Sequence, residues 1–158
     1  MQTNLFLAAY RQADFLQRQT QLLLNSYQHW TGEVLVSNAE TVQGLMDLSY
    51  AVASHTSNED PQFNYANKAA LTLFKMREDE FLGLPSRYSA EPMLREQRAA
   101  FLAEVTTNGF VQNYSGVRIA KDGSRFLIEQ ATVWNVVDIA QPENVLGQAV
   151  VIKKWELL

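Results

Sequence analysis

Hydrophobic positions in the first third of the chain recur with helical spacing. No Gly or Pro interrupts Thr3–Trp30, where the apolar residues roughly follow one face of an amphipathic helix. Gly32 can take the left-handed conformation that ends a helix. A capping-box spacing then predicts a second helix over Ser37–Leu48. We therefore expect residues 1–48 to form a helical extension.

The spacing of hydrophobic residues changes after that extension. The segments Ser49–His55 and Gln62–Asn67 are short and β-prone, and the turn-forming cluster Ser57–Pro61 separates them. Asn67 is a residue type that caps helices, which predicts a helix over Lys68–Phe74. This part of the chain is expected to supply two strands and a helix.

Two further helices and a loop are expected next. Arg77–Gly83 has the pattern of one short helical turn closed by glycine, and Leu84–Tyr88 has that of a loop. A longer helix is predicted over Pro92–Asn108, because proline is tolerated in a first helical turn.

The last third is rich in strands. Phe110–Ala120 and Ser124–Val137 flank a Lys-Asp-Gly turn, which indicates a hairpin, and Val145–Trp155 is expected as one more strand. The order predicts an α+β fold over residues 49–158. Its expected architecture is a five-stranded antiparallel sheet with helices on one face, preceded by the two leading helices.

This order and its residues resemble a PAS domain, in particular the strand-to-helix passage Phe63–Gly83 and the hairpin Lys121–Glu129. A closer similarity is to the MEKHLA domain, a PAS-like family, in its stand-alone microbial and cyanobacterial type. That similarity spans about residues 26–158. The segments that carry it are Ser26–Gly32, Ser54–Phe74, Leu84–Pro92, Glu104–Asp138 and Ile152–Trp155.

The resemblance implies a sensory or regulatory module that holds a small molecule between sheet and helices and signals through protein contacts. It implies no enzymatic activity. PAS relatives that bind flavin place Asn-Cys-Arg where this chain has Pro85, Ser86 and Arg87. A flavin–cysteine adduct is therefore excluded, while non-covalent flavin with Arg87 at its phosphate, or a small metabolite, stays open. Haem is disfavoured, because 92–108 holds no histidine for an axial ligand.

Composition narrows the classes of partner and cofactor. The chain has 13 Lys and Arg against 17 Asp and Glu, which argues against a broad nucleic-acid surface. It has no cysteine, so thiolate nucleophiles and Cys-ligated metal centres are excluded. No apolar run is long enough to span a membrane, and no signal peptide is recognisable. We expect a soluble, cytoplasmic protein.

Candidate ligand contacts are polar residues inside strands that otherwise suit burial, since a buried polar group needs a partner. With a neighbouring tryptophan, they are Asn64, Arg118, Glu129, Gln130, Trp134, Asn135 and Gln148. The side of the sheet that each faces is open, because the hairpin register is uncertain by one residue. A cross-strand ion pair of Arg118 with Glu129 is the structural alternative.

The two histidines are separate cases. His29 ends the first predicted helix, where interaction with the last carbonyl groups is expected. His55 ends the first predicted strand and is either a hydrogen-bonded structural residue or a ligand contact. No spacing of ligand-type residues predicts a metal site.

Three functions remain open at this point. The first is the sensory module, and the second is a ligand-free module for protein interaction or dimerisation. The third is a small isomerase or hydrolase that uses Glu129 as a base. For either of the first two we expect a homodimer through the leading helices and an unidentified downstream protein.

Overall fold

The computed structural model describes residue 8 and residues 12–37, 41–90 and 95–158. The expected helix Thr3–Trp30 is not continuous, because Gln12 is extended (φ −83°, ψ 129°) and the helix begins at Ala13. Residues 1–7 and 9–11, the Glu40 half of the expected capping box and the expected start of the long helix at Pro92 lie outside the described residues. The elements in chain order are α2 (Ala13–Thr31), α3 (Thr41–Met46), β1 (Ala51–Thr56), β2 (Phe63–Ala66), α4 (Lys68–Phe74), α5 (Glu78–Phe81), the 3-10 helix η1 (Ser86–Ser89), α6 (Arg95–Asn108), β3 (Phe110–Ile119), β4 (Arg125–Val136), β5 (Gly147–Ile152) and β6 (Lys154–Leu157).

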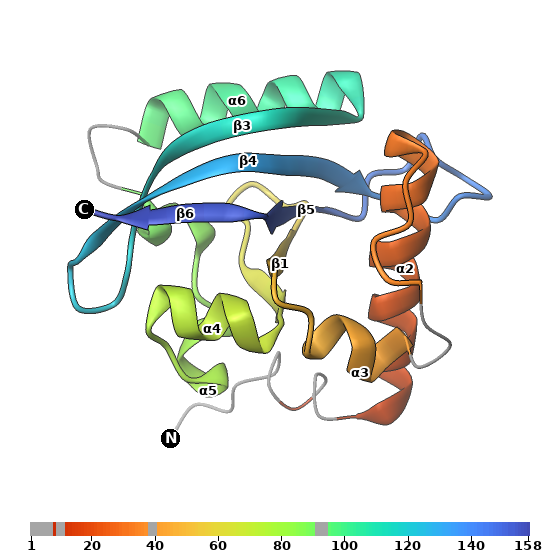
Figure 1. Ribbon diagram of the computed structural model, residues 1–158. Helices are drawn as coiled ribbons and strands as arrows, with labels where there is room; N and C mark the ends of the chain where they lie inside the picture. Colours follow the sequence, from red (N-terminus) through yellow and green to blue (C-terminus); the bar gives the residue numbers. More distant parts are fainter. Residues whose placement is uncertain (1–7, 9–11, 38–40, 91–94) are drawn as a thin grey trace.

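One antiparallel sheet organises the molecule (Figure 1). Its strands follow the order β2-β1-β5-β4-β3, with β6 also beside β4. The hairpin between β3 and β4 turns at Gly123, which has a φ of +85°. The predicted α+β architecture with an antiparallel sheet is confirmed. The expected loop at Leu84–Tyr88 differs, because η1 occupies most of it.

The sheet has six strands in place of the predicted five, because the last strand is interrupted. The pairs Thr132–Val151 and Glu129–Lys154 have the same register, so β5 and β6 follow one line along β4. Between them Gln130 adopts a φ of +52°, which an extended strand does not allow. The pairing of β4 with the last part of the chain is therefore interrupted at Gln130 and Ala131, and it is present on both sides of them.

Helix α2 covers the face of the sheet that α4, α5 and α6 leave free. On that face Gln19 donates a hydrogen bond to Ser54 of β1, and the Trp30 indole donates one to the backbone oxygen of Asn135. Leu23 and Tyr27 are fully buried there and belong to the same hydrophobic core as the sheet. Gly32 ends the helix in the left-handed conformation, as predicted.

Asn67 connects the leading helices with the core. Its side-chain oxygen accepts hydrogen bonds from the backbone N–H groups of Val52 and Ala70, and the second of these is the predicted helix cap. Its side-chain N–H₂ group donates to the carbonyl oxygens of Leu45 and Tyr50. One buried amide thus fixes the ends of α3 and β1 at the start of α4.

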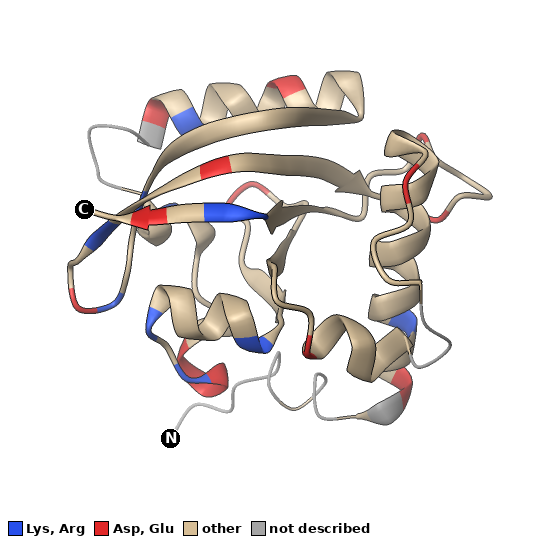
Figure 2. Cartoon of the chain, in the orientation of Figure 1, with Lys and Arg blue, Asp and Glu red and all other residues tan. Residues whose placement is uncertain are grey.

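No helix in the described part of the chain is both long and apolar enough to cross a membrane. Figure 2 shows Lys and Arg residues interspersed with Asp and Glu over the elements. Several of the charged side chains form exposed ion pairs, such as Lys68 with Asp47 and Lys75 with Asp122. Exposed pairs of this kind contribute little to stability.

Candidate functional site

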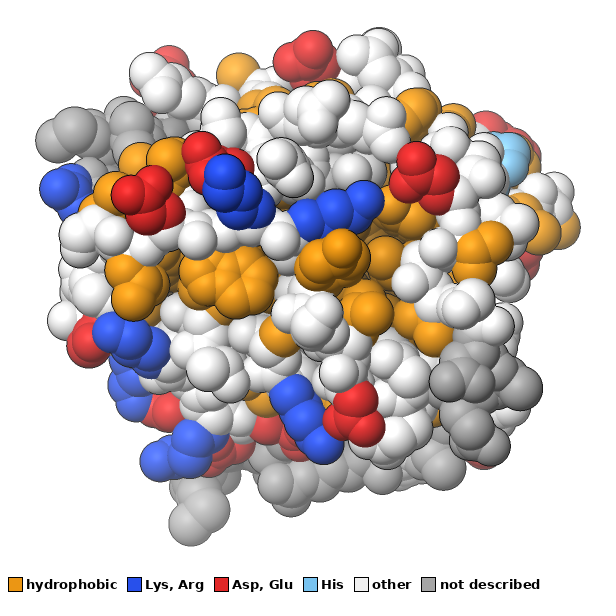
Figure 3. Space-filling view, viewed as in Figure 1, with side chains coloured by type: hydrophobic (Ala, Val, Ile, Leu, Met, Phe, Trp, Pro, Cys, Tyr) orange, Lys and Arg blue, Asp and Glu red, His pale blue; other side chains and the backbone are white. Residues whose placement is uncertain are grey.

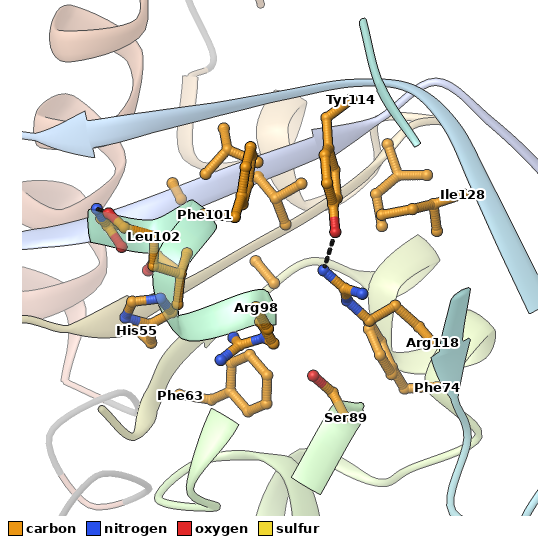
Figure 4. A pocket seen from close by; sticks show the side chains of 17 residues that line it. His55, Phe63, Phe74, Ser89, Arg98, Phe101, Leu102, Tyr114, Arg118 and Ile128 are labelled. Carbon is orange, nitrogen blue, oxygen red and sulfur yellow. Dashed lines mark hydrogen bonds between the residues drawn. The ribbon is translucent and has the colours of Figure 1, made fainter. Parts of the chain in front are cut away.

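A cavity of about 60 Å³ lies between the sheet and the layer of α4, η1 and α6. Every strand from β1 to β5 contributes to its wall, and Figure 4 shows the side chains that surround it. The volume has room for about four to six water-sized groups. A small metabolite is therefore the size of molecule that fits this space without rearrangement.

Four Phe and Tyr rings line two parts of the cavity wall. Phe101 of α6 and Tyr114 of β3 stack with their ring centres 4.1 Å apart and their planes at 17°. Phe63 and Phe74 line the opposite part, with ring centres 6.4 Å apart. Stacked and tilted rings of this kind give a ligand a flat apolar surface to pack against.

Two arginines reach the cavity from different elements. Arg118 of β3 donates to the Tyr114 hydroxyl at 2.8 Å and to the backbone oxygen of Val117 at 2.9 Å. Arg98 of α6 also lines the cavity, and its buried Nε has no hydrogen-bond partner. Burial, and secondarily the charge of Arg118, lower the pKa of Arg98 to about 10, so it stays cationic at neutral pH. The cavity is therefore electropositive.

His55 supplies an uncharged polar group. Its Nδ1 lies 2.7 Å from the carbonyl oxygen of Thr56, which only accepts, so Nδ1 carries the proton. Burial lowers the pKa of His55 to about 4, and the charge of Arg98 adds to this direction. The imidazole is neutral at pH 7, and Nε2 is left as an acceptor.

Gln148 of β5 joins the cavity to α6. Its side-chain N–H₂ group lies 2.9 Å from both the Leu102 carbonyl and the Thr106 hydroxyl, and 3.2 Å from the Asn135 side-chain oxygen. Asn135 in turn donates to the Thr106 carbonyl. Two strand amides thus hold the C-terminal half of α6 on the sheet, and Gln148 lines the cavity as well.

A second hollow of about 290 Å³ adjoins the first, between the C-terminal half of α6 and the loop after β1. The two share His55, Leu102 and Gln148 in their walls. These three side chains therefore separate the inner cavity from the outer hollow. A ligand that enters by this route has to pass the residues that hold α6.

Of the nine predicted contacts, three line the cavity: His55, Arg118 and Gln148. Asn135 lies next to it, held to Gln148. The predicted ion pair of Arg118 with Glu129 is not formed, because Arg118 turns to Tyr114 while Glu129 lies 3.6 Å from Lys154.

Three other β4 candidates lie outside the cavity wall because of the bulge. The φ of +52° at Gln130 shifts the alternation, so that Ile128 and Val133, five positions apart, both line the cavity. Gln130 itself is exposed and Glu129 half-buried. Trp134 is fully buried on the opposite face, where its indole donates to Ser26 of α2.

The remaining two candidates also lie away from the cavity wall. Asn64 accepts a hydrogen bond from Ser54, the residue that also contacts α2. Arg87 forms an ion pair with Asp60 at 3.1 Å and lies over the Tyr88 ring. Both side chains already have partners within the chain.

Arg98 is the residue that the sequence analysis missed. It shares one helical face with Phe101, Leu102 and Val105, at spacings of three, four and seven residues. A cationic residue within such an apolar helical face is the sequence signal that could have identified Arg98 as a cavity residue. Long side chains of this kind, however, often extend to solvent from the edge of a stripe.

The residues of the cavity can be compared with the needs of a flavin and with those of a metal ion. The stacked Phe101 and Tyr114 rings occupy the space between α6 and β3, so a three-ring flavin enters only if they separate. Among the described residues, no three His, Cys, Asp or Glu side chains lie close enough to hold a metal ion.

Comparisons with known proteins agree with this geometry. A family model described as the MEKHLA domain matches residues 17–157, which begins within α2. No curated protein matches the chain.

Similar solved structures are PAS and light-oxygen-voltage domains. A PAS domain from Colwellia psychrerythraea aligns with a TM-score of 0.59 at 15% identity, covering 73% of this chain and 92% of that one. A light-oxygen-voltage domain described with a flavin analogue gives 0.57 at 20%, covering 74% and 83%. The same type of domain from an Erythrobacter litoralis blue-light activated histidine kinase gives 0.53 at 16%, covering 70% and 97%.

Proposed function

Because the chain belongs to the MEKHLA domain family, whose fold here is that of PAS domains, we propose that it is a sensory module with a small-molecule site between sheet and α6. The observation that carries the proposal is the cavity of about 60 Å³ with His55, Arg118 and Gln148 in its wall. Polar groups that converge on an otherwise apolar cavity are typical of a ligand site.

Gln148 provides the link from ligand to helix. It lines the cavity and also bonds the Leu102 carbonyl and the Thr106 hydroxyl of α6. A ligand that hydrogen-bonds to Gln148 competes with those bonds, because an N–H₂ group has two protons to donate. Binding therefore changes how firmly α6 is held, which is a local event that a partner can detect.

The output is proposed to pass to a downstream protein by surface contact. Figure 3 shows a band of hydrophobic side chains across the middle of the molecule, between β6 and the helices α3 and α4. Near the C-terminus, the exposed hydrophobic residues include Trp155, Leu157 and Leu158. Apolar side chains that gather at a surface support a protein-contact role.

Homodimerisation stays a prediction. The apolar face of α2, with Leu23 and Tyr27, is buried on the sheet of its own chain. A dimer through this helix would have to use its other face. Sedimentation of the full chain over a range of concentrations tests it, and a constant monomer mass would exclude it.

Glu129, the base that the enzyme alternative needs, is paired with Lys154 outside the cavity wall, and this position gives that alternative no support. A ligand-free interaction module is the second alternative. It requires that no small molecule binds the cavity.

The proposal is tested by a thermal-shift screen of small metabolites and flavins, followed by hydrogen exchange on any compound that stabilises the protein. A ligand of the folded state at about 100 times its Kd should raise Tm by roughly 5–10 °C. It should also change amide exchange in α6.

Ala53→Val provides the control, because residue 53 lines the cavity from β1 and valine suits a strand. This variant should keep the fold and lose the shift. An equal shift in Ala53→Val would place binding elsewhere. No shift with any compound would favour the ligand-free module.

A further inference from the structure

Two cationic side chains share a mostly apolar cavity, and no ion pair in the described part of the chain joins either of them to a carboxylate. Arg98 comes from α6 and Arg118 from β3, so the fold brings them together from different elements (Figure 4). The described ion pairs engage other arginines, such as Arg77 and Arg87. Buried charges in folded proteins are normally paired.

The hydrogen bonds of the two guanidinium groups are also incomplete. Arg118 uses two of its donors, on the Tyr114 hydroxyl and the Val117 carbonyl. The Nε of Arg98 is buried without a partner. A buried donor of a charged group that has no acceptor destabilises the folded protein. A ligand that accepts a hydrogen bond from this donor gains binding free energy correspondingly.

Among the described residues, the wall of the cavity contains no Asp or Glu that could compensate these charges. His55 also lines the cavity, and its imidazole is neutral at pH 7 because burial holds its pKa near 4. The rest of the wall comes mainly from Phe63, Phe74, Phe101 and aliphatic side chains. An anion placed here would neutralise two cations at once.

We propose that Arg98 and Arg118 bind the carboxylate of a small organic acid whose apolar part occupies the cavity beside the stacked Phe101 and Tyr114. This inference rests on the proposed function and specifies its ligand class. A guanidinium group matches a planar carboxylate with two parallel N–H donors. The apolar wall suits the remainder of such a molecule, whereas inorganic phosphate would fill the cavity with strongly hydrated oxygens.

The volume limits the size of the acid. Room for about four to six water-sized groups corresponds to a short acid such as pyruvate or isobutyrate. A larger aromatic acid would require the Phe101–Tyr114 pair to open.

The arrangement also predicts an unusual stability signature. Burial next to a like charge disfavours the charged form of Arg98, so without an anion this residue destabilises the folded protein. Replacing it with methionine, which is of similar length and uncharged, should raise the Tm of the ligand-free protein. A residue with a purely structural role would lower Tm when replaced.

The test compares sodium pyruvate, isobutyrate and benzoate with isobutyramide, inorganic phosphate and sodium chloride at equal ionic strength. Tm is measured for the full chain and for Arg98→Met, Arg98→Lys, Arg118→Met and Arg87→Met. Arg87 is the matched control, an exposed arginine already paired with Asp60. Far-UV circular dichroism checks that each variant is folded.

At least one carboxylate should stabilise the unmodified protein and Arg87→Met equally. Its affinity should fall at least about tenfold in Arg98→Lys, because the planar donor pair is lost, and further in Arg98→Met. Arg118→Met should weaken binding as well, because it removes the second cation of the cavity.

Other outcomes separate the two proposals. Equal stabilisation by isobutyramide, retained in Arg98→Met, would leave the sensory function standing and overturn the anion site. Stabilisation by phosphate alone would overturn the carboxylate assignment. No shift with any acid, alongside a positive result in the wider metabolite screen, would overturn this inference only. No shift in either experiment would overturn both.

Discussion

The indole of Trp134 on β4 donates a hydrogen bond to the hydroxyl of Ser26 on α2 at 3.0 Å, across 108 positions of sequence. Both side chains are fully buried, and the Tyr27 ring meets Trp134 edge-on with centres 5.0 Å apart. The leading helix is therefore packed into the core of the molecule, on the face opposite the cavity.

Ser26→Ala should cost about 1–3 kcal/mol of unfolding free energy, because it leaves a buried indole N–H without an acceptor. Urea denaturation followed by tryptophan fluorescence measures it, with the exposed Ser57→Ala as control. In a double-mutant cycle with Trp134→Phe the two losses should be less than additive. Full additivity would mean that the hydrogen bond contributes nothing.

Asn67→Asp should cost about 3 kcal/mol or more at neutral pH. In the unmodified protein the carbonyl groups of Leu45 and Tyr50 accept hydrogen bonds from the Asn67 side chain. The change keeps the two contacts in which the side chain accepts but places an anionic oxygen against those carbonyl groups. Chemical denaturation of the variant and of Asn144→Asp, an exposed site, gives the comparison. Similar losses at both sites would contradict the role given to Asn67.

His55 should make the protein less stable as the pH falls from about 6.5 to about 4. Its folded-state pKa is about 4 against an ordinary value of 6.5, so in this window the unfolded chain binds a proton that the folded chain does not. The loss from this residue amounts to about 3 kcal/mol and is complete below pH 4.

The measurement is the free energy of unfolding at several pH values for the unmodified protein and for His55→Asn, which keeps an N–H donor. The free energy of unfolding of His55→Asn should depend less steeply on pH. His29→Gln, which removes the other, exposed histidine, controls for the loss of an imidazole as such. An unchanged slope in His55→Asn would mean that other groups cause the pH dependence.

Gly147→Ala should destabilise the protein more than Gly123→Ala. A β-carbon at residue 147 would lie directly against the backbone carbonyl oxygen of His55, which has no room to move within the β1–β5 ladder. We expect a loss of about 3 kcal/mol there. At Gly123 only the positive φ opposes alanine, so about 1–2 kcal/mol is expected. Thermal unfolding ranks the two, and the reverse order would refute the steric argument.

Gln148→Leu should loosen α6 while the sheet stays intact. The variant removes the donors to the Leu102 carbonyl and the Thr106 hydroxyl but keeps the size of the side chain. Hydrogen exchange should become faster in the C-terminal half of α6 and stay unchanged in β1 and β5 beyond the immediate neighbours of residue 148. Thr107→Ala, on the exposed side of α6, should have no such effect.

Much of the fold followed from local pattern. The helical spacing before Gly32, the cap at Asn67 and the Lys-Asp-Gly turn are properties of neighbouring residues, and each is in the structure as predicted. Local chemistry sets such features because the hydrogen bonds and allowed backbone angles involved span only a few residues.

Which residues line the cavity depends on strand pairing and packing between distant parts of the chain. The positive φ at Gln130 shifts the alternation along β4, so a strict two-residue period misassigns the faces of Glu129 and Trp134. Arg98 required the tertiary structure, since the helical spacing alone does not distinguish a cation that turns inward from one that extends to solvent.

The sequence by itself determined the order of helices and strands, the absence of thiol chemistry and the family resemblance, because these depend on residue type and on neighbours a few positions away. Only the tertiary structure decided which face of the sheet α2 covers, and that Arg98 and Arg118 meet in one cavity. Such meetings are set by how the elements pack around a shared core, and small shifts in strand register redirect every side chain that follows.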